Sequence, residues 1–331
     1  MRFIQRILFI SAFLFLSACD GTNSEPNANA SATAVTGETT SQEVAKQVSN
    51  HPTAQKKSHK DVSSGKHPIW KIQGDHNSVY IMGSIHLLSK DLYPLDEVYQ
   101  NAYADAERLV FEIDEQLLDQ ASVQAAVLNF APLSGAETLE QAIGSEKYAE
   151  VKRLAKENNL PMLMFENFDP WFSYVNLSNM LVMNAGYSPE SGIDMHFMQR
   201  GLSDGKPIDG LETLPEQLNF FEQIPMDQQA DMLLEVMQNS HEVPGMLTEL
   251  VSEWQSGDMD GLAELLLEDM HKTPAMYDLL LKQRNHNWVD KILPLLQEQD
   301  DYLIIVGAGH LAGPDSVIKL LQDRGVQAVQ F

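Results

Sequence analysis

Two histidines of this sequence occupy equivalent places in the same pattern. His86 follows Gly83 by three positions, and His310 follows Gly307 by three positions. Each pair comes at the end of an apolar run that predicts a buried strand, and a helical segment follows each pair. If both strands belong to one sheet, the two imidazoles reach the same edge. One Gly-x-x-His pattern carries little information, but two in equivalent positions favour a shared site.

An acidic residue completes this candidate set. Glu112 lies near the end of a predicted strand, 108–113. A β-α-β unit joins this strand to the one before His86, so we expect Glu112 and His86 at the ends of adjacent parallel strands. Two neutral imidazoles and a carboxylate can hold a divalent metal and leave positions open for water and substrate. Such a metal lowers the pKa of its water and polarises a carbonyl, which is the chemistry of hydrolysis.

Arg284 and Glu212 are further candidates for catalysis. Arg284 is expected one helical turn before Trp288 on the same face, where its guanidinium can stabilise an oxyanion or a substrate carboxylate. An internal salt bridge is the alternative role for Arg284. Glu212 follows the predicted strand 206–211 and is a reserve ligand or base, or else a cap for the next helix.

Glycines accompany both histidines. Gly83, Gly307 and Gly309 allow the backbone to turn sharply and allow a ligand to approach. Gly307, Gly309 and Ala312 also match the dinucleotide-binding pattern G-x-G-x-x-A. That pattern requires an acidic residue about 20 positions on, at the end of the next strand, whereas here the next strand runs into Phe331 and carries none. We therefore expect no NAD.

The charge of the chain excludes some partner classes. The formal net charge is −25, whereas nucleic acid and anionic lipid are held by clusters of Lys and Arg. We therefore expect no nucleic-acid partner, and contact with a membrane only through a lipid anchor. The sequence also lacks G-x-S-x-G, H-E-x-x-H and a P-loop, which are the motifs of serine esterases, zincins and NTPases.

Residues 1–19 predict a lipoprotein signal peptide. A basic start precedes apolar residues 7–16, which are too few to span a bilayer. Residues 16–19 match the bacterial lipobox, in which the thiol of Cys19, the only cysteine, carries the lipid. An ordinary signal peptide is the alternative. Asp20 favours the inner membrane of the cell envelope, with the protein facing the periplasm.

The remaining chain divides into a tether and one domain. Residues 20–67 are polar and contain few large apolar side chains, so we expect a disordered tether. Residues 68–331 predict an α/β domain with a largely helical insertion at about 115–300. The final helix is expected to start with Pro314 and stop at Gly325.

The expected fold is α/β, with a central, mostly parallel sheet flanked by helices. Two β-(Gly-x-x-His)-α-β units build this sheet, and the helical insertion lies between them in the sequence. A hairpin with a turn at 74–77 opens the domain. The other strands are expected at 78–83, 108–113, 206–211, 302–307 and 326–330.

Several segments together resemble the TraB/PrgY/GumN family. They are residues 80–87, 109–114, 210–213 with Glu216 and Gln217, Arg284 to Trp288, and 306–314. The resemblance covers about residues 70–331 in order. The family includes the Tiki proteins, which are animal metalloproteases, and its fold is similar to that of erythromycin esterase and ChaN-like proteins.

The resemblance implies site residues and an activity. The family's paired Gly-x-x-His motifs, glutamate and arginine correspond to His86, His310, Glu112 and Arg284. It implies a peptidase that depends on a divalent metal, with manganese or cobalt indicated and zinc possible, acting on a peptide or small-molecule substrate. A non-catalytic peptide- or haem-binding protein and a metal-independent esterase that uses histidine as a base are the alternatives.

Overall fold

The computed structural model describes residues 65–114, 119–267, 270 and 274–331. The predicted signal peptide, Cys19, Asp20 and the tether up to residue 64 lie outside the described residues. His67, at the end of the predicted tether, donates its backbone N–H to the carbonyl of Phe331. Within the described ranges, no helix combines the length and the apolar character needed to cross a membrane.

A sheet of six strands forms the centre of the described chain. The strands are β1 (Ile69–Gln73), β2 (Ser78–Ser84), β3 (Arg108–Ile113), β4 (Ile208–Glu212), β5 (Tyr302–Gly307) and β6 (Ala328–Gln330). Their order is β4-β3-β5-β2-β1-β6. The first four in this order are mutually parallel, whereas β1 is antiparallel to both β2 and β6. The predicted α/β fold with a mostly parallel sheet is confirmed.

The two strands that precede the histidines are direct neighbours. β2 and β5 pair in parallel, with Ser84 opposite Gly307, so the prediction that they share a sheet is confirmed. The expected adjacency of the strands that carry His86 and Glu112 is wrong, because β5 lies between β2 and β3. Every residue of β5 is buried. A strand that is apolar throughout is favoured at the centre of a sheet, where both of its faces are covered.

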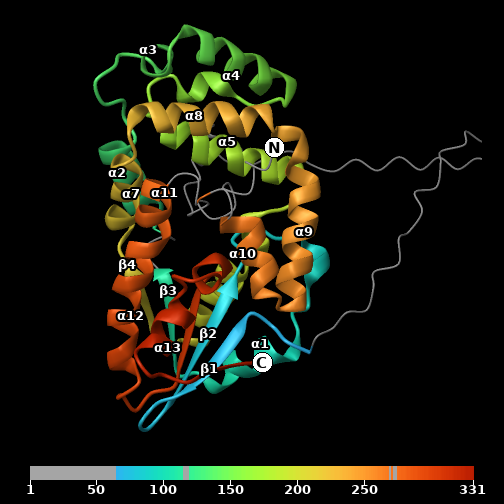
Figure 1. Ribbon diagram of the computed structural model, residues 1–331, viewed down its shortest axis with the longest axis vertical. Helices are drawn as coiled ribbons and strands as arrows, with labels where there is room; N and C mark the ends of the chain where they lie inside the picture. The colour runs from blue at the N-terminus through green and yellow to red at the C-terminus, as the bar shows by residue number, and fades with distance from the viewer. Residues whose placement is uncertain (1–64, 115–118, 268–269, 271–273) are drawn as a thin grey trace, which may run out of the picture. The chain divides into compact units, whose positions relative to one another are not determined.

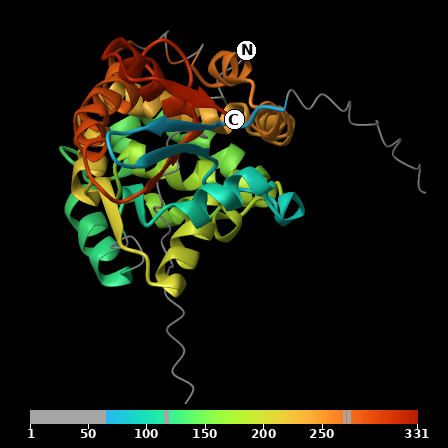
Figure 2. The same cartoon turned by 90° about the horizontal axis from the view of Figure 1, so that it is seen from below.

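Helices lie on both faces of the sheet and beyond its carboxyl-terminal edge (Figures 1 and 2). Those packed on the faces are α1 (Glu97–Asp105), α6 (Ile193–Asp204), α12 (Gln283–Leu295) and α13 (Val317–Asp323). The others are α2 (Gln120–Phe130), α3 (Leu139–Ile143), α4 (Ser145–Glu157), α5 (Pro170–Asn184), α7 (Leu214–Glu222), α8 (Met226–Gln238), α9 (Val243–Ser256), α10 (Met259–Leu267) and α11 (Pro274–Tyr277).

One hydrophobic core joins the sheet to α12 and α13. It contains Trp70 and Ile72 of β1, Ile304 of β5, Trp288 of α12 and Leu321 of α13, each at most 5% exposed. The alternation of β1 places Trp70 and Ile72 on the same face. Burial of these large side chains stabilises α12, which carries Arg284 to the carboxyl-terminal edge of the sheet.

The segment after β5 differs from its prediction. The final helix, α13, begins at Val317 rather than at Pro314. The side chain of Ser316 accepts the N–H of Lys319 and so caps α13. Gly313 has a φ of +81°, which interrupts the helical backbone before this cap. His310 lies instead in a short 3₁₀ turn, η9 (Ala308–Leu311), directly after β5.

The helical insertion contacts the ends of the strands. Trp254 of α9 donates its indole N–H to the carbonyl of Gly83 at 2.8 Å, and its ring stacks on Tyr99 of α1 at 5.4 Å. In Figure 1, the arrowheads of β2 and β3 point toward this half of the molecule. α9 is therefore fixed next to the residues that follow β2.

The start of α6 approaches the backbone of His86 closely. A Cβ atom on Gly192 would lie 2.1 Å from the carbonyl oxygen of His86. Only glycine therefore allows the amino terminus of α6 to dock here, and the N–H of Ile193 donates to the carbonyl of Ile85 at 3.1 Å.

Replacement of this glycine should destabilise the fold. We expect Gly192→Ala to lower the free energy of unfolding by about 1–3 kcal/mol, because the methyl group forces two backbones apart. Urea denaturation measures the effect. Gly245→Ala is the matched control, because a Cβ there meets nothing within 4 Å and alanine favours the helix. Equal stability of the two variants would contradict the close approach at Gly192.

Candidate functional site

Five sequence-predicted site residues meet at the carboxyl-terminal edge of the parallel strands. Glu112 and Glu212 come from β3 and β4, His86 follows β2, His310 lies in η9 and Arg284 comes from α12. All five are buried, with exposures between 1% and 9%. Parallel strands place their carboxyl ends at one edge, which explains how residues from distant parts of the chain converge here.

The guanidinium of Arg284 is the centre of this arrangement. Nε donates to Glu212 at 3.0 Å, and Nη2 donates at 2.8 Å to both Glu112 and Glu212. Nη1 donates to the carbonyl of Leu280 at 3.2 Å and lies 3.1 Å from Nε2 of His310. A guanidinium has five N–H donors, and these contacts engage all of them. The predicted role as an oxyanion donor would therefore require Arg284 to release one of these partners.

Glu112 uses its two carboxylate oxygens differently. Oε2 accepts hydrogen bonds from Arg284 and, at 3.2 Å, from Gln217. Oε1 accepts the N–H of Gly307 at 2.8 Å and lies 3.7 Å from Nε2 of His86. Burial by itself raises the pKa of Glu112, but the positive charge of Arg284, the protonated ring of His86 and the N–H of Gly307 outweigh it and lower the pKa to about 2. Glu112 is therefore ionised at neutral pH.

Glu212 forms the other half of the pairing with Arg284. Burial raises its pKa, and Arg284 opposes that rise. The helix that follows Glu212 is capped by a different residue, because Thr213 and Glu216 form a capping box at the start of α7. The structure therefore places Glu212 in the site and not in the cap that was its alternative role.

Two of the predicted glycines make room for neighbouring atoms of the site. A Cβ on Gly307 would lie 3.2 Å from Oε1 of Glu112 and 3.4 Å from Nε2 of His86, and a Cβ on Gly83 would lie 3.1 Å from Cα of Ala308. None of Gly83, Gly307 and Gly309 belongs to the described residues with positive φ. A turn of the chain at these glycines therefore does not depend on left-handed backbone.

His86 is paired with a carboxylate. Its Nδ1 lies 2.8 Å from Oδ2 of Asp194, and Oδ1 of Asp194 accepts the hydroxyl of Ser84 at 2.6 Å. Burial alone lowers the pKa of His86, but Asp194 and then Glu112 outweigh it and raise the pKa to about 9. As the structure stands, the ring is protonated at neutral pH.

His310 is paired with an amide. Its Nδ1 lies 2.6 Å from Oδ1 of Asn285, and its ring lies 4.2 Å from that of Trp288. Burial, and next the positive charge of Arg284, lower the pKa of His310 to about 3. This imidazole is therefore neutral at physiological pH.

Sequence reasoning missed three residues that contact the predicted set. Asp194, Asn285 and Gln217 are each at most 3% exposed. Asn285 directly follows Arg284, and Gln217 lies in the helix after Glu212, so local proximity was a signal for both. Asp194 has a weaker signal, an acidic residue in the first turn of a helix, which usually indicates only a favourable interaction with the helix dipole.

The predicted metal ligands fit a divalent cation in kind, and in part in spacing. In the part of the chain that the structure describes, no three His, Cys, Asp or Glu side chains are already placed to hold a metal ion. Two ligands of a tetrahedral ion lie roughly 3.4 Å apart, close to the 3.7 Å between His86 and Glu112. A cavity of about 20 Å³ adjoins His86 and Gly307. His310 could bind a metal only after giving up its contact with Arg284.

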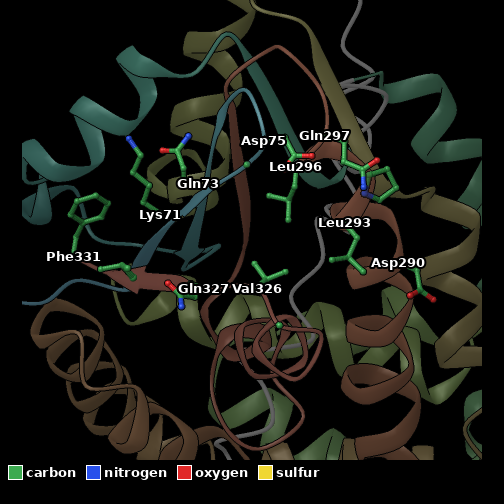
Figure 3. Close-up of a pocket in the computed structure, with 14 residues that line it drawn as sticks. Lys71, Gln73, Asp75, Asp290, Leu293, Leu296, Gln297, Val326, Gln327 and Phe331 are labelled. Atoms are coloured by element: carbon green, nitrogen blue, oxygen red, sulfur yellow. The ribbon is translucent and has the colours of Figure 1, made fainter.

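A much larger pocket than this cavity lies elsewhere in the described chain. It has a volume of about 1030 Å³ and lies between the edge of the sheet and the end of α12 (Figure 3). Gln73 and Asp75 line it, and Gln73 pairs with Ser78, at the start of β2. The pocket is therefore at the opposite end of β2 from His86 and is separate from the buried site.

The fold and site define an α/β protein with a buried histidine–carboxylate–arginine cluster at the carboxyl edge of its parallel strands. Residues 68–330 match the TraB/PrgY/gumN family. The chain therefore belongs to that family, as the sequence resemblance indicated.

Three relatives carry no described function. The chain is 26% identical to the uncharacterized protein YbaP of Shigella flexneri, over 78% of this chain and 94% of YbaP. It is 26% identical to YbaP of Escherichia coli K12, over 73% of this chain and 87% of YbaP. An uncharacterized protein of Treponema pallidum is 22% identical over 80% of this chain and 82% of its own length. No solved structure matches the chain.

Removal of the guanidinium should destabilise the protein, because two buried carboxylates would lose their counter-ion. We expect Arg284→Met to lower the free energy of unfolding by about 3–5 kcal/mol at neutral pH, because Glu112 and Glu212 lose their cation. The double variant Glu212→Gln/Arg284→Met should lose less, because one unpaired charge is removed as well. Urea denaturation compares the two. A double variant less stable than Arg284→Met would show that the carboxylates do not depend on Arg284.

Proposed function

We propose that the cluster is the active site of a peptidase, a hydrolase that uses a divalent metal ion held by His86, Glu112 and His310. The observation that carries this proposal is the charge of the buried site. Glu112, Glu212 and Asp194 are three carboxylates, each at most 9% exposed. Among the described residues, Arg284 is the only Lys or Arg that forms an ion pair with any of them.

This imbalance needs a counter-charge. With neutral imidazoles, three carboxylates and one guanidinium leave two negative charges in a buried place, which is unfavourable unless they are paired. Protonation of His86 balances one of them. A divalent cation beside His86 and Glu112 balances both, and imidazole nitrogen and carboxylate oxygen are its usual ligands.

The residues of the chain have separable roles in this proposal. When bound, the metal ion lowers the pKa of a water molecule and polarises the scissile carbonyl. Arg284 holds Glu112 and Glu212 in fixed orientations and limits their repulsion. Glu212, outside the ligand set, is the group that can accept or return a proton, since burial raises its pKa. The peptide substrate rests on the likeness to the Tiki proteins.

A metal-independent hydrolase is the second candidate. The contact of 2.8 Å between Asp194 and His86 is a carboxylate–imidazole pair, the arrangement in which a histidine acts as a base on water; because the pKa of His86 is raised to about 9, this base would act in alkaline solution. The cavity of about 20 Å³ beside His86 has room for one water molecule. A chelator separates the two candidates, because it would leave this second activity intact.

The proposed hydrolase works at the cell envelope. The lipobox that ends at Cys19 supplies the lipid anchor, and Asp20 favours the inner membrane. The catalytic domain would therefore act on periplasmic substrates near the membrane surface.

Metal-dependent turnover tests the proposal. We expect the purified protein to bind Mn²⁺ in calorimetry and to cleave members of a peptide library, and a chelator should abolish cleavage until Mn²⁺ is restored. His310→Ala should remove both binding and cleavage, because a neutral ligand is lost. His310 is 1% exposed and bonds to Asn285 and Arg284, so His310→Ala should also unfold at a lower temperature than the wild type in chelator, and circular dichroism must show that the variant is folded where Mn²⁺ binding is measured.

A matched histidine provides the control. His241 has a side chain that is 74% exposed, so His241→Ala should leave Mn²⁺ binding and cleavage unchanged. Cleavage that persists in chelator would favour the metal-independent hydrolase. Tight peptide binding without cleavage, with or without Mn²⁺, would show a binding protein and would overturn the proposed hydrolase.

A further inference from the structure

We infer that Asp194 and Asn285 are positioning residues, which hold His86 and His310 in the Nδ1–H tautomer and direct both Nε2 atoms toward the Glu112–Arg284 pair. The role in metal binding rests on the proposed function, because the orientation of the two rings matters only if they hold the metal ion. The hydrogen bonds that carry it stand independently of any metal.

The tautomer of His310 follows from the donors around it. The amide nitrogen of Asn285 donates to the carbonyl of Asp315 at 2.7 Å, so its Oδ1 is the atom that faces Nδ1 of His310. An amide oxygen only accepts, and therefore Nδ1 must carry a proton. On the other side of the ring, Arg284 only donates, so Nε2 must offer a lone pair. Both contacts require the same tautomer.

The same logic applies to His86. Oδ1 of Asp194 is occupied by the hydroxyl of Ser84, which leaves Oδ2 to accept from Nδ1 of the ring. Asp194 is 3% exposed, and the close packing of Gly192 on the backbone of His86 fixes where α6 begins. The carboxylate is therefore held on both sides. Nε2 of the neutral ring is left to face Oε1 of Glu112.

The two positioning residues differ in charge. Asp194 brings a negative charge to His86, and Asn285 brings only a dipole to His310. A partner on the far nitrogen fixes the tautomer and orientation of a metal-binding histidine, and a carboxylate also raises its basicity. Of the two rings, His86 is therefore the more strongly donating ligand.

Nitrogen NMR of ¹⁵N-histidine-labelled protein tests the assignment directly. Long-range ¹H–¹⁵N spectra of the metal-free protein distinguish the two tautomers, and a pH titration followed in the same spectra shows where each ring is neutral and can be read. In Asp194→Leu we expect that His86 alone is no longer held in the Nδ1–H tautomer. In Asn285→Leu we expect the same change for His310 alone. Asp194→Asn should retain it, because an amide oxygen can replace the carboxylate as the acceptor.

A second readout and a matched control accompany the spectra. Mn²⁺ affinity should fall roughly 10–100-fold in each leucine variant. Asp169 is the control, because it is also a buried aspartate that accepts a serine hydroxyl, from Ser134, and its hydrogen bonds involve no histidine. Asp169→Leu should change neither tautomer. If Asp194→Leu fails to fold, Asn285→Leu tests the same assignment through His310.

The outcomes separate this inference from the proposed function. A leucine variant whose own histidine keeps the Nδ1–H tautomer would overturn the assignment of its partner. Tautomers that change as expected in a protein that binds no Mn²⁺ would support the positioning residues and overturn the metal site. Wild-type Mn²⁺ binding that survives undiminished in both leucine variants would overturn the positioning role and leave the metal site standing.

Discussion

A single guanidinium, buried among carboxylates, is the interaction on which the rest of the site depends. Arg284 is 5% exposed and bonds to Glu112 and Glu212. Ions buried in this way are tolerated only when every donor and acceptor is satisfied. Three features keep the donors of Arg284 paired with the two carboxylates. Trp288 packs against the sheet, a residue other than Glu212 caps α7, and the strand order brings Glu112 and Glu212 to the same edge.

Sheet order explains why the cluster is so compact. β5 lies between β2 and β3, so the N–H of Gly307 reaches Glu112 on one side while η9 holds His310 beside α12. Without a side chain on Gly307, a histidine and a carboxylate can approach the same point. A sheet in which β2 and β3 were adjacent would remove Gly307 from its place between His86 and Glu112.

The insertion contributes to the site as well as covering it. α6 supplies Asp194, α7 supplies Gln217, and α9 is tied to Gly83 through Trp254. These helices lie between the two Gly-x-x-His units in the sequence, and in the folded chain they contact residues of the site. The chemistry of the edge therefore belongs to both halves of the chain.

The sequence by itself determined the strands, the mostly parallel sheet and the five side chains at its edge, because apolar runs and glycine spacing are local signals. The sequence predicted that His86 and Glu112 lie close together because their strands are adjacent. In the structure the two side chains do lie close together, but β5 lies between their strands. Asp194 and its partner His86 are 108 positions apart, and Arg284 and Glu112 are 172 apart. Only the folded chain decides such pairings, because they depend on which buried charges must neutralise one another, and no local pattern records that requirement.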